Sequence, residues 1–301
     1  MVRKKSKKIY PIFLPFSGCK FRCSFCNQWA SSGVLPENFL SQVLESLEFL
    51  KSSKSVYDEV SIYGGTPIWS KLAWDMMEKL QILIDEGKIK GIRLSTRPDS
   101  ITEQIAQRLK SLRVKTVELG IQSLSNKVLS CINRGHSIED VERAIEVLNK
   151  FDIDVVGQFM IGLPCEGNEI YDIPIWSKQK GLVGVRIFPL IVLKGTEIEK
   201  LYLEKKYVPL SVDEAVYKLG IIVKKLEEYG IPVIQIGLHS SDILNSHVVA
   251  GPYLGNLGEM VRSFVHYLQV QEGKIHIDDV PISQRKMFKR WEEMVNSGNF
   301  G

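Results

Sequence analysis

The chain has 301 residues, of which 44% are hydrophobic and 25% are charged, enough to build a large core in a single α/β barrel. It contains no apolar stretch of roughly 18 residues and opens on no apolar signal segment, so we expect a cytoplasmic protein without membrane association. The formal net charge is +4, and five positive charges lie before residue 9, so the remaining body carries −1. This predicts a basic tail at residues 1–8 that either contacts nucleic-acid phosphates or remains solvated.

Short β-rich segments alternate with helical patterns along the chain, which is typical of a parallel sheet with crossover helices. Ser100–Glu103 and Ser137–Asp140 have the form of helix N-caps, which places the preceding residues where a strand passes into a helix. In barrels built this way, those junctions form the active face. We therefore predict an α/β fold with six βα units, whose strands are residues 9–14, 57–63, 91–96, 114–120, 153–161 and 182–188.

Three cysteines, Cys19, Cys23 and Cys26, lie in the loop after the first predicted strand. Thiolates at the spacing C-x3-C-x2-C can bind three irons of one [4Fe–4S] cluster and leave the fourth iron open for the amino and carboxylate groups of S-adenosylmethionine. Phe25, directly before the last cysteine, could shield such a cluster and border the adenine. A zinc site would need a fourth ligand, and the nearest histidine, His136, lies far downstream. Structural disulfides are not expected without an oxidising compartment.

Glycines and polar residues follow the second and third predicted strands. Gly64 and Gly65, with Thr66 after them, would let bare backbone approach a ligand, although paired glycines alone also form tight turns. Ser95 opens the polar string Ser95–Asp99, which either begins a helix or lines the pocket.

The fourth and fifth predicted strands carry polar residues where a buried strand is normally apolar. Glu118 and Gln122 need partners there, and a bound polar ligand would supply them. Arg134 could pair with a cofactor carboxylate through two parallel hydrogen bonds, the other interpretation being a surface helix end. Gln158 and Met160 share one side of the fifth strand, so a flat adenine could lie against them.

Two further cysteines are isolated in the sequence. Cys131 and Cys165 are too few to hold a second cluster. Cys165 follows the fifth strand and is interpreted either as a radical quencher or thiol donor, or as a small apolar filler of its loop. We interpret His136 as a capping or packing residue rather than a ligand.

The last hundred residues predict a smaller unit. Apolar spacing indicates an amphipathic helix over 212–226, and 231–236 predicts a strand that could pair with an open barrel edge. The basic stretch Arg285–Arg290 with Trp291 predicts a surface helix or a partner contact. The predicted domains are the basic tail 1–8, a barrel over 9–198 and a small α/β extension over 199–301.

The cysteine loop resembles that of the radical S-adenosylmethionine superfamily. Ser95–Asp99, Val117–Ser123 and Arg134–His136 look like the radical domain of the Elongator catalytic subunit and its bacterial relatives, and more distantly like oxygen-independent coproporphyrinogen oxidase. The resemblance implies a partial (β/α)6 TIM-like barrel with a small C-terminal extension, and it implies that the Gly64-Gly65-Thr66 segment contacts the methionine amino group of the cofactor.

Similarity to the oxidase also implies roles for single residues. Gln122 and Arg134 match residues that hold the cofactor. Gln158 stands where the oxidase has an aspartate, and Ser95 replaces an acidic position, which puts the ribose contacts of that enzyme in question here.

The resemblance implies a radical enzyme, either an oxidoreductase or a transferase. It would cleave S-adenosylmethionine reductively at a [4Fe–4S] cluster to a 5′-deoxyadenosyl radical and abstract hydrogen from an unidentified substrate. An electron donor such as a flavodoxin or ferredoxin would supply the electron. The Elongator-like strings and the basic tail favour RNA as substrate, whereas the oxidase-like features and the nearly neutral body favour a small metabolite or tetrapyrrole. A non-catalytic cluster or haem carrier on the same fold is the third hypothesis.

Overall fold

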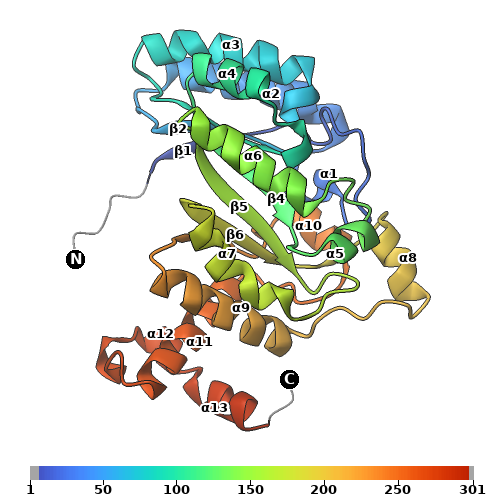
Figure 1. Ribbon diagram of the computed structural model, residues 1–301, viewed down its shortest axis with the longest axis vertical. Helices are drawn as coiled ribbons and strands as arrows, with labels where there is room; N and C mark the ends of the chain where they lie inside the picture. The colour runs from blue at the N-terminus through green and yellow to red at the C-terminus, as the bar shows by residue number, and fades with distance from the viewer. Residues whose placement is uncertain (1–6, 298–301) are drawn as a thin grey trace. The chain divides into compact units, whose positions relative to one another are not determined.

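The computed structural model describes residues 7–297 (Figure 1). Their contacts group into two compact units. The first contains the described residues up to Arg22 together with Asn27–Ile121 and Gly135–Gly157, and the second contains Cys23–Cys26, Gln122–Arg134 and the described residues from Gln158 onward. The cysteine loop and strand β5 (Asp154–Ile161) therefore each contribute residues to both units.

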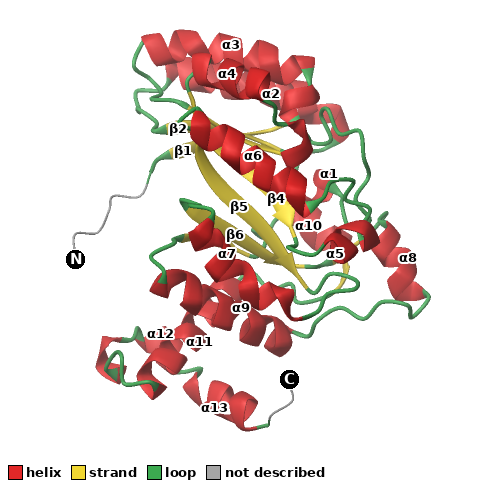
Figure 2. Ribbon diagram, in the orientation of Figure 1, coloured by secondary structure: helices red, strands yellow, loops and turns green. Residues whose placement is uncertain are grey.

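Parallel strands form the sheet of the first unit. Ile9 pairs with Glu59, Val60 with Ile92, and Ser95 with Glu118. Each strand is followed by a helix, as the alternation of yellow and red along the chain in Figure 2 shows. The elements of this unit are β1 (Ile9–Phe13), α1 (Gln28–Ser32), α2 (Phe39–Ser52), β2 (Glu59–Tyr63), α3 (Lys71–Asp85), β3 (Ile92–Thr96), α4 (Glu103–Ser111), β4 (Val114–Gln122, whose last residue belongs to the second unit) and α6 (Ile138–Lys150).

One of the two predicted helix caps is confirmed. Helix α6 begins with a capping box in which the Ser137 hydroxyl accepts from the Asp140 amide and the Asp140 carboxylate accepts in return. The prediction at Ser100 is wrong, because α4 is capped by Thr102, whose hydroxyl accepts from the Ile105 amide. The Ser100 hydroxyl instead donates to the Arg97 carbonyl at 2.6 Å and lies within a short 3-10 turn.

The second unit combines a strand pair with a layer of helices. Val185 of β6 pairs in parallel with Val233 of β8, so the predicted strand at 231–236 does pair with the last strand of the barrel. Helix α11 contacts α9, α12 and α13. The remaining elements are α5 (Asn126–Cys131), α7 (Ile173–Gln179), β6 (Gly184–Pro189), β7 (Val192–Leu193), α8 (Glu197–Leu203), α9 (Val212–Glu228), β8 (Val233–Ile236), α10 (Asp242–His247), β9 (Val248–Ala250), α11 (Leu257–Gln271), α12 (Ile282–Arg285) and α13 (Phe288–Asn296).

Of the two alternatives predicted for the basic stretch with Trp291, the surface helix is present as α13, whose Lys289 and Arg290 are exposed, but Trp291 itself is buried. Its side chain is completely buried, its ring meets Phe264 edge-on, and its indole N–H donates to the Ser263 hydroxyl at 2.8 Å. Helix α13 is strongly amphipathic, and its apolar side packs on α11. The C-terminal helix is therefore part of the core of the second unit.

The strand order of the sheet is β1-β2-β3-β4-β5-β6-β8. Six successive strand-to-helix units with parallel pairing are the topology of a partial (β/α)6 TIM-like barrel, so the predicted fold class is confirmed. Each of the six barrel strands begins and ends within two residues of its predicted limits. The boundary predicted between residues 198 and 199 stays a prediction.

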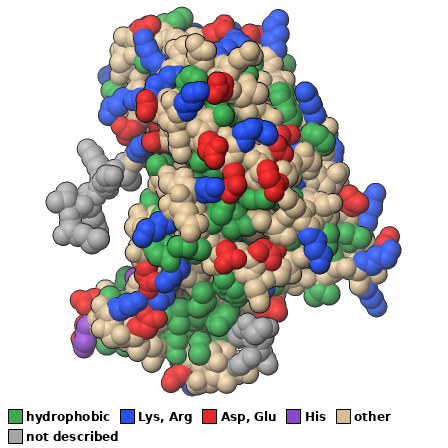
Figure 3. All heavy atoms as spheres, viewed as in Figure 1, with side chains coloured by type: hydrophobic (Ala, Val, Ile, Leu, Met, Phe, Trp, Pro, Cys, Tyr) green, Lys and Arg blue, Asp and Glu red, His purple; other side chains and the backbone are tan. Residues whose placement is uncertain are grey.

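The basic start of the chain is partly engaged with the first unit. Lys7 Nζ lies 3.1 Å from a Glu59 carboxylate oxygen, and the Lys8 amide donates to Asp58 at 2.8 Å. Arg3, Lys4 and Lys5 lie outside the described residues. Basic and acidic side chains are interspersed over the helices of the first unit on the face drawn in Figure 3. Over residues 7–297, no helix is both long and apolar enough to cross a bilayer.

Candidate functional site

The three loop cysteines are half-buried and outside any disulfide. Cys19 belongs to the first unit, whereas Cys23 and Cys26 belong to the second. Within the described part of the chain, no three His, Cys, Asp or Glu side chains converge closely enough to hold a metal ion. The chemistry of the donors nevertheless fits an iron–sulfur cluster, because three free thiols at C-x3-C-x2-C spacing suit it.

Gln28 organises the surroundings of Cys19. Its side-chain oxygen accepts from the backbone N–H groups of Phe16 and Gly65, the latter at 2.6 Å, and its side-chain nitrogen lies 3.7 Å from Cys19 Sγ. The Thr66 hydroxyl lies 3.5 Å from the same sulfur. Gln28 was not among the predicted site residues. Gln28 could have been suspected from its position, because it begins α1 only two residues after Cys26.

The paired glycines are required by close backbone packing rather than by a simple turn. Gly64 and Gly65 have φ of +85° and +63°, a region in which side chains are strained. A Cβ on Gly65 would lie 2.1 Å from the Ser17 carbonyl oxygen, and one on Gly64 would lie 3.1 Å from Leu14 backbone atoms. The segment thus lies directly against the chain that leads to Cys19.

Arg97 holds the middle of the cysteine loop. Its guanidinium pairs with both carboxylate oxygens of Asp99, at 2.9 and 3.0 Å, and its charge lies 4.5 Å from the centre of the Phe21 ring. Lys20 lies 4.5 Å from the Trp69 ring centre. Within the string Ser95–Asp99, Arg97 therefore contacts the loop between Cys19 and Cys23, a role that neither sequence interpretation included.

The turn Cys23–Cys26 is fastened within the second unit. The Ser24 amide donates to the Ile132 carbonyl and its carbonyl accepts from the Ile198 amide, both at 3.0 Å. Phe25 packs against an apolar cluster of the same unit, which comprises Val128, Leu129, Ile132, Met160, Leu163, Phe188, Leu190, Val192, Ile198 and Tyr207.

Arg134 contacts a predicted cluster ligand directly. Its Nη1 lies 3.3 Å from Cys23 Sγ, and its side chain is buried. A guanidinium N–H donated to a thiolate sulfur is a charge-assisted hydrogen bond. Hydrogen bonds to ligand sulfurs are among the factors that set the potential of an iron–sulfur cluster. His136 is also buried, in keeping with the packing role expected of it.

Gln122 carries a buried polar atom that has no hydrogen-bond partner among residues 7–297. Its side chain is 4% exposed, its φ is +72°, and no described residue donates to its Oε1. An acceptor left in this way costs about 1–3 kcal/mol unless a ligand or water pairs with it. Gln158 and Ser95 are half-buried, and Met160 is buried.

Glu118 has a protein partner, contrary to the interpretation that a ligand pairs with it. Arg93 Nη1 lies 2.8 Å from Glu118, the Arg93 Nε donates to Glu59 at 2.8 Å, and the Tyr63 hydroxyl donates to Glu118 at 3.1 Å. Burial by itself would raise the pKa of Glu59, but the Arg93 charge and the hydrogen bonds from Thr116 and Arg93 together hold that pKa below its ordinary value.

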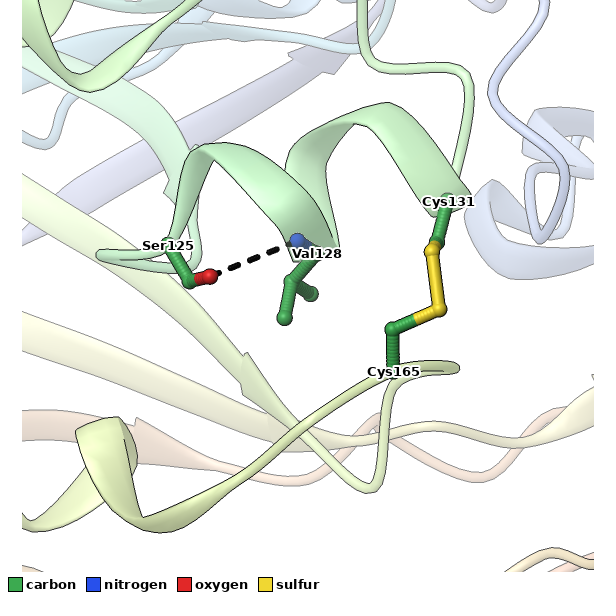
Figure 4. Close-up of a disulfide and its surroundings, with 4 residues drawn as sticks. All are labelled: Ser125, Val128, Cys131 and Cys165. Atoms are coloured by element: carbon green, nitrogen blue, oxygen red, sulfur yellow. Dashed lines mark hydrogen bonds between the residues drawn. A yellow bond between two sulfur atoms is a disulfide. The ribbon is translucent and has the colours of Figure 1, made fainter.

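The structure corrects the prediction for Cys165. Cys165 is bonded to Cys131 in a disulfide, so it offers no thiol for quenching a radical or donating sulfur (Figure 4). It is not a buried filler either, because both cysteines are exposed. The expectation that this chain lacks structural disulfides is wrong at this pair, which lies 34 residues apart in sequence.

Comparison with known families identifies the chain. The model of the radical SAM superfamily matches residues 13–172, and the model of the radical SAM C-terminal domain matches residues 182–266. The chain belongs to the radical SAM superfamily. It is thus a radical SAM enzyme, and the cofactors of this superfamily are a [4Fe–4S] cluster and S-adenosylmethionine.

Relatives of this radical SAM chain include proteins with named RNA targets. An uncharacterized protein of Methanocaldococcus jannaschii is 27% identical over 253 residues, covering 82% of this chain and 75% of its own. A tRNA uridine(34) acetyltransferase of Methanocaldococcus infernus is 26% identical over 63% of this chain, which spans only 36% of that protein. The solved structure of Methanocaldococcus infernus Elp3 has a TM-score of 0.66 at 21% identity, covering 89% of this chain and 64% of its own, and supports the fold.

Proposed function

We propose that the chain cleaves S-adenosylmethionine reductively and uses the resulting radical to abstract hydrogen from an RNA. The observation that carries the proposal is the trio of thiols Cys19, Cys23 and Cys26, none of them in a disulfide, in a superfamily that uses the [4Fe–4S] cluster. When bound, the cluster would supply the electron that divides the cofactor into methionine and a 5′-deoxyadenosyl radical. A flavodoxin or ferredoxin type of protein is the proposed electron donor.

Residues of each unit support the proposal. In the first unit, Gln28 and Thr66 fix the Cys19 sulfur while Gly64 and Gly65 leave bare backbone beside the loop. In the second unit, Arg134 donates to Cys23, and Phe25 adds an apolar ring next to Cys26. We propose that these residues, with Ser95, Gln158 and Met160, form the cofactor pocket.

Gln122 supports the presence of a polar ligand. Its buried Oε1 accepts from no described residue, so a donor from the cofactor, such as a ribose hydroxyl or an amino group, would remove the cost of that unpaired acceptor. Gln122 belongs to the second unit.

RNA is favoured as the substrate class by the relatives. Two Methanocaldococcus proteins that match 60% or more of this chain are named tRNA uridine(34) acetyltransferases. The basic residues at the start of the chain could add phosphate contacts that depend on salt but not on sequence.

The experiment has two arms. Anaerobically reconstituted protein given dithionite and S-adenosylmethionine should release 5′-deoxyadenosine, and Cys23→Ala should abolish the release, whereas Ser130→Ala, an exposed position outside the loop, should not. Equal release by Cys23→Ala and wild type would refute the radical assignment, and an intact cluster without cleavage would favour the cluster or haem carrier.

The second arm tests the substrate. Replacing Arg3, Lys4 and Lys5 by serine spares Lys7 and Lys8, which contact Glu59 and Asp58. Binding to a tRNA should weaken, and the slope of the logarithm of the binding constant against the logarithm of the salt concentration should become shallower by up to about 3. Unchanged RNA binding together with hydrogen abstraction from a small metabolite or tetrapyrrole would contradict RNA as the substrate.

A further inference from the structure

The Cys131–Cys165 disulfide lies at the surface of the second unit, where a thiol in solution can reach it. Both cysteines are exposed, and their Cα atoms are 6.4 Å apart. Figure 4 shows Cys131 at the end of helix α5 and Cys165 in the loop that passes beneath it. Exposed disulfides exchange with thiols more readily than buried ones, because the attacking thiolate needs access to a sulfur.

The helix that carries Cys131 depends on its surroundings. Helix α5 has six residues, far fewer than an isolated helix needs to be stable in water. At its start the Ser125 hydroxyl accepts from the Val128 amide at 3.4 Å, and beyond its end the Arg134 amide donates to the Leu129 carbonyl at 2.9 Å. The disulfide joins this short helix covalently to the loop that contains Cys165.

The residues directly after Cys131 hold the cluster turn. The Ile132 carbonyl, one residue on, accepts the Ser24 amide at 3.0 Å, and Arg134, three residues on, donates to Cys23 Sγ at 3.3 Å. The end of α5 that the disulfide fastens therefore supplies two of the contacts that hold the turn Cys23–Cys26, beside the Ile198 amide and the packing of Phe25.

Cys165, the partner of Cys131 in the disulfide, lies in a constrained loop. Cys165 has φ of +66°, a left-handed conformation that is unusual for a residue with a side chain. The loop closes on itself, since the Leu163 amide donates to the Glu166 carboxylate and the Glu166 amide donates back to the Leu163 carbonyl. This loop gives the end of α5 a fixed anchor.

We propose that Cys131 and Cys165 form a reversible thiol–disulfide site whose oxidation state sets how firmly the turn Cys23–Cys26 is held. A dithiol reductant of the thioredoxin class attacks one sulfur as its thiolate, forms a mixed disulfide and releases the other cysteine as a thiol. Its second thiol then resolves the mixed disulfide. Two electrons and two protons pass to the protein, and the reductant leaves as its own disulfide. The importance of the turn rests on the proposed function.

The first test follows the thiols of the native, cluster-loaded protein. It is incubated anaerobically with dithiothreitol without denaturant, and thiols that become reactive are alkylated and located by mass spectrometry. Cys131 and Cys165 should become alkylated together, while Cys19, Cys23 and Cys26 stay protected. A disulfide that opens only after denaturation would overturn the proposal.

The second test reads the turn by hydrogen exchange at the Ser24 amide, in protein without added cluster. The exchange rate of the Ser24 amide should rise about fivefold when the disulfide is reduced, because one hydrogen bond is loosened. The variants Cys131→Ser and Cys165→Ser should show the same rise. Ser130→Ala, next to Cys131, should leave the exchange unchanged, as should the amides of α9 in all variants. Unchanged exchange in both cysteine variants would overturn the coupling. Because this readout needs no cluster, absence of 5′-deoxyadenosine would refute the proposed function alone.

Discussion

Replacing Gly65 by alanine tests whether the paired glycines are needed for backbone packing beside Cys19. Gly87 provides a matched control, because its φ of +72° is similar and nothing lies within 4 Å of the Cβ that alanine would add. Both variants lose stability through the left-handed backbone, by about 1–2 kcal/mol. A Cβ on Gly65 would also lie 2.1 Å from the Ser17 carbonyl oxygen and 2.7 Å from its nitrogen, so main chain must move.

That movement disturbs two hydrogen bonds, from the Thr66 amide to the Ser17 carbonyl at 2.7 Å and from the Gly65 amide to Gln28 at 2.6 Å. At a net worth of about 1 kcal/mol each, their loss brings the total for Gly65→Ala to about 3–4 kcal/mol. Urea unfolding of the protein without cluster measures both variants, and iron content after reconstitution should be lower for Gly65→Ala. Equal losses of stability in the two variants would refute the packing argument.

Three further predictions concern charges and hydrogen bonds at the site. Because folding lowers the pKa of Glu59, this carboxylate stabilises the folded state above its ordinary pKa of 4.5, and the stabilisation is lost as pH falls through the lower folded pKa. The free energy of unfolding measured in urea should therefore decline below about pH 5, by up to about 1.4 kcal/mol per pH unit. The decline should be less steep in Glu59→Gln. Arg93→Met should destabilise the chain by about 3–5 kcal/mol in thermal or urea unfolding, since it leaves buried carboxylates unpaired, and a neutral result would contradict their burial. Arg134→Gln should lower the cluster potential in an anaerobic redox titration followed by electron paramagnetic resonance, because the sulfur of Cys23 loses a charged donor; an unchanged potential would show that this hydrogen bond does not act on the cluster.

The sequence predicts the parts of this protein that depend on local pattern. The strands follow from β-rich segments between helical repeats, and Ser137 with Asp140 shows the spacing of a capping box. The thiol trio is visible because its members lie within eight residues of one another.

Features that depend on distant neighbours were missed or misread. Arg93 meets Glu59 and Glu118 only because three adjacent strands bring them together, and no spacing in the sequence encodes that contact. Cys131 and Cys165 can be paired only when the distance between their Cα atoms is known. The burial of Trp291 could not be predicted from its own helix, because Phe264, which meets its ring, lies on another helix.

The contact of the Lys8 amide with Asp58 holds Lys8 at the amino end of β1. The cysteine loop follows the carboxyl end of the same strand, and five strand residues extend over about 17 Å. A ligand that contacts both Lys8 and the cysteine loop would therefore have to be about as long as the strand.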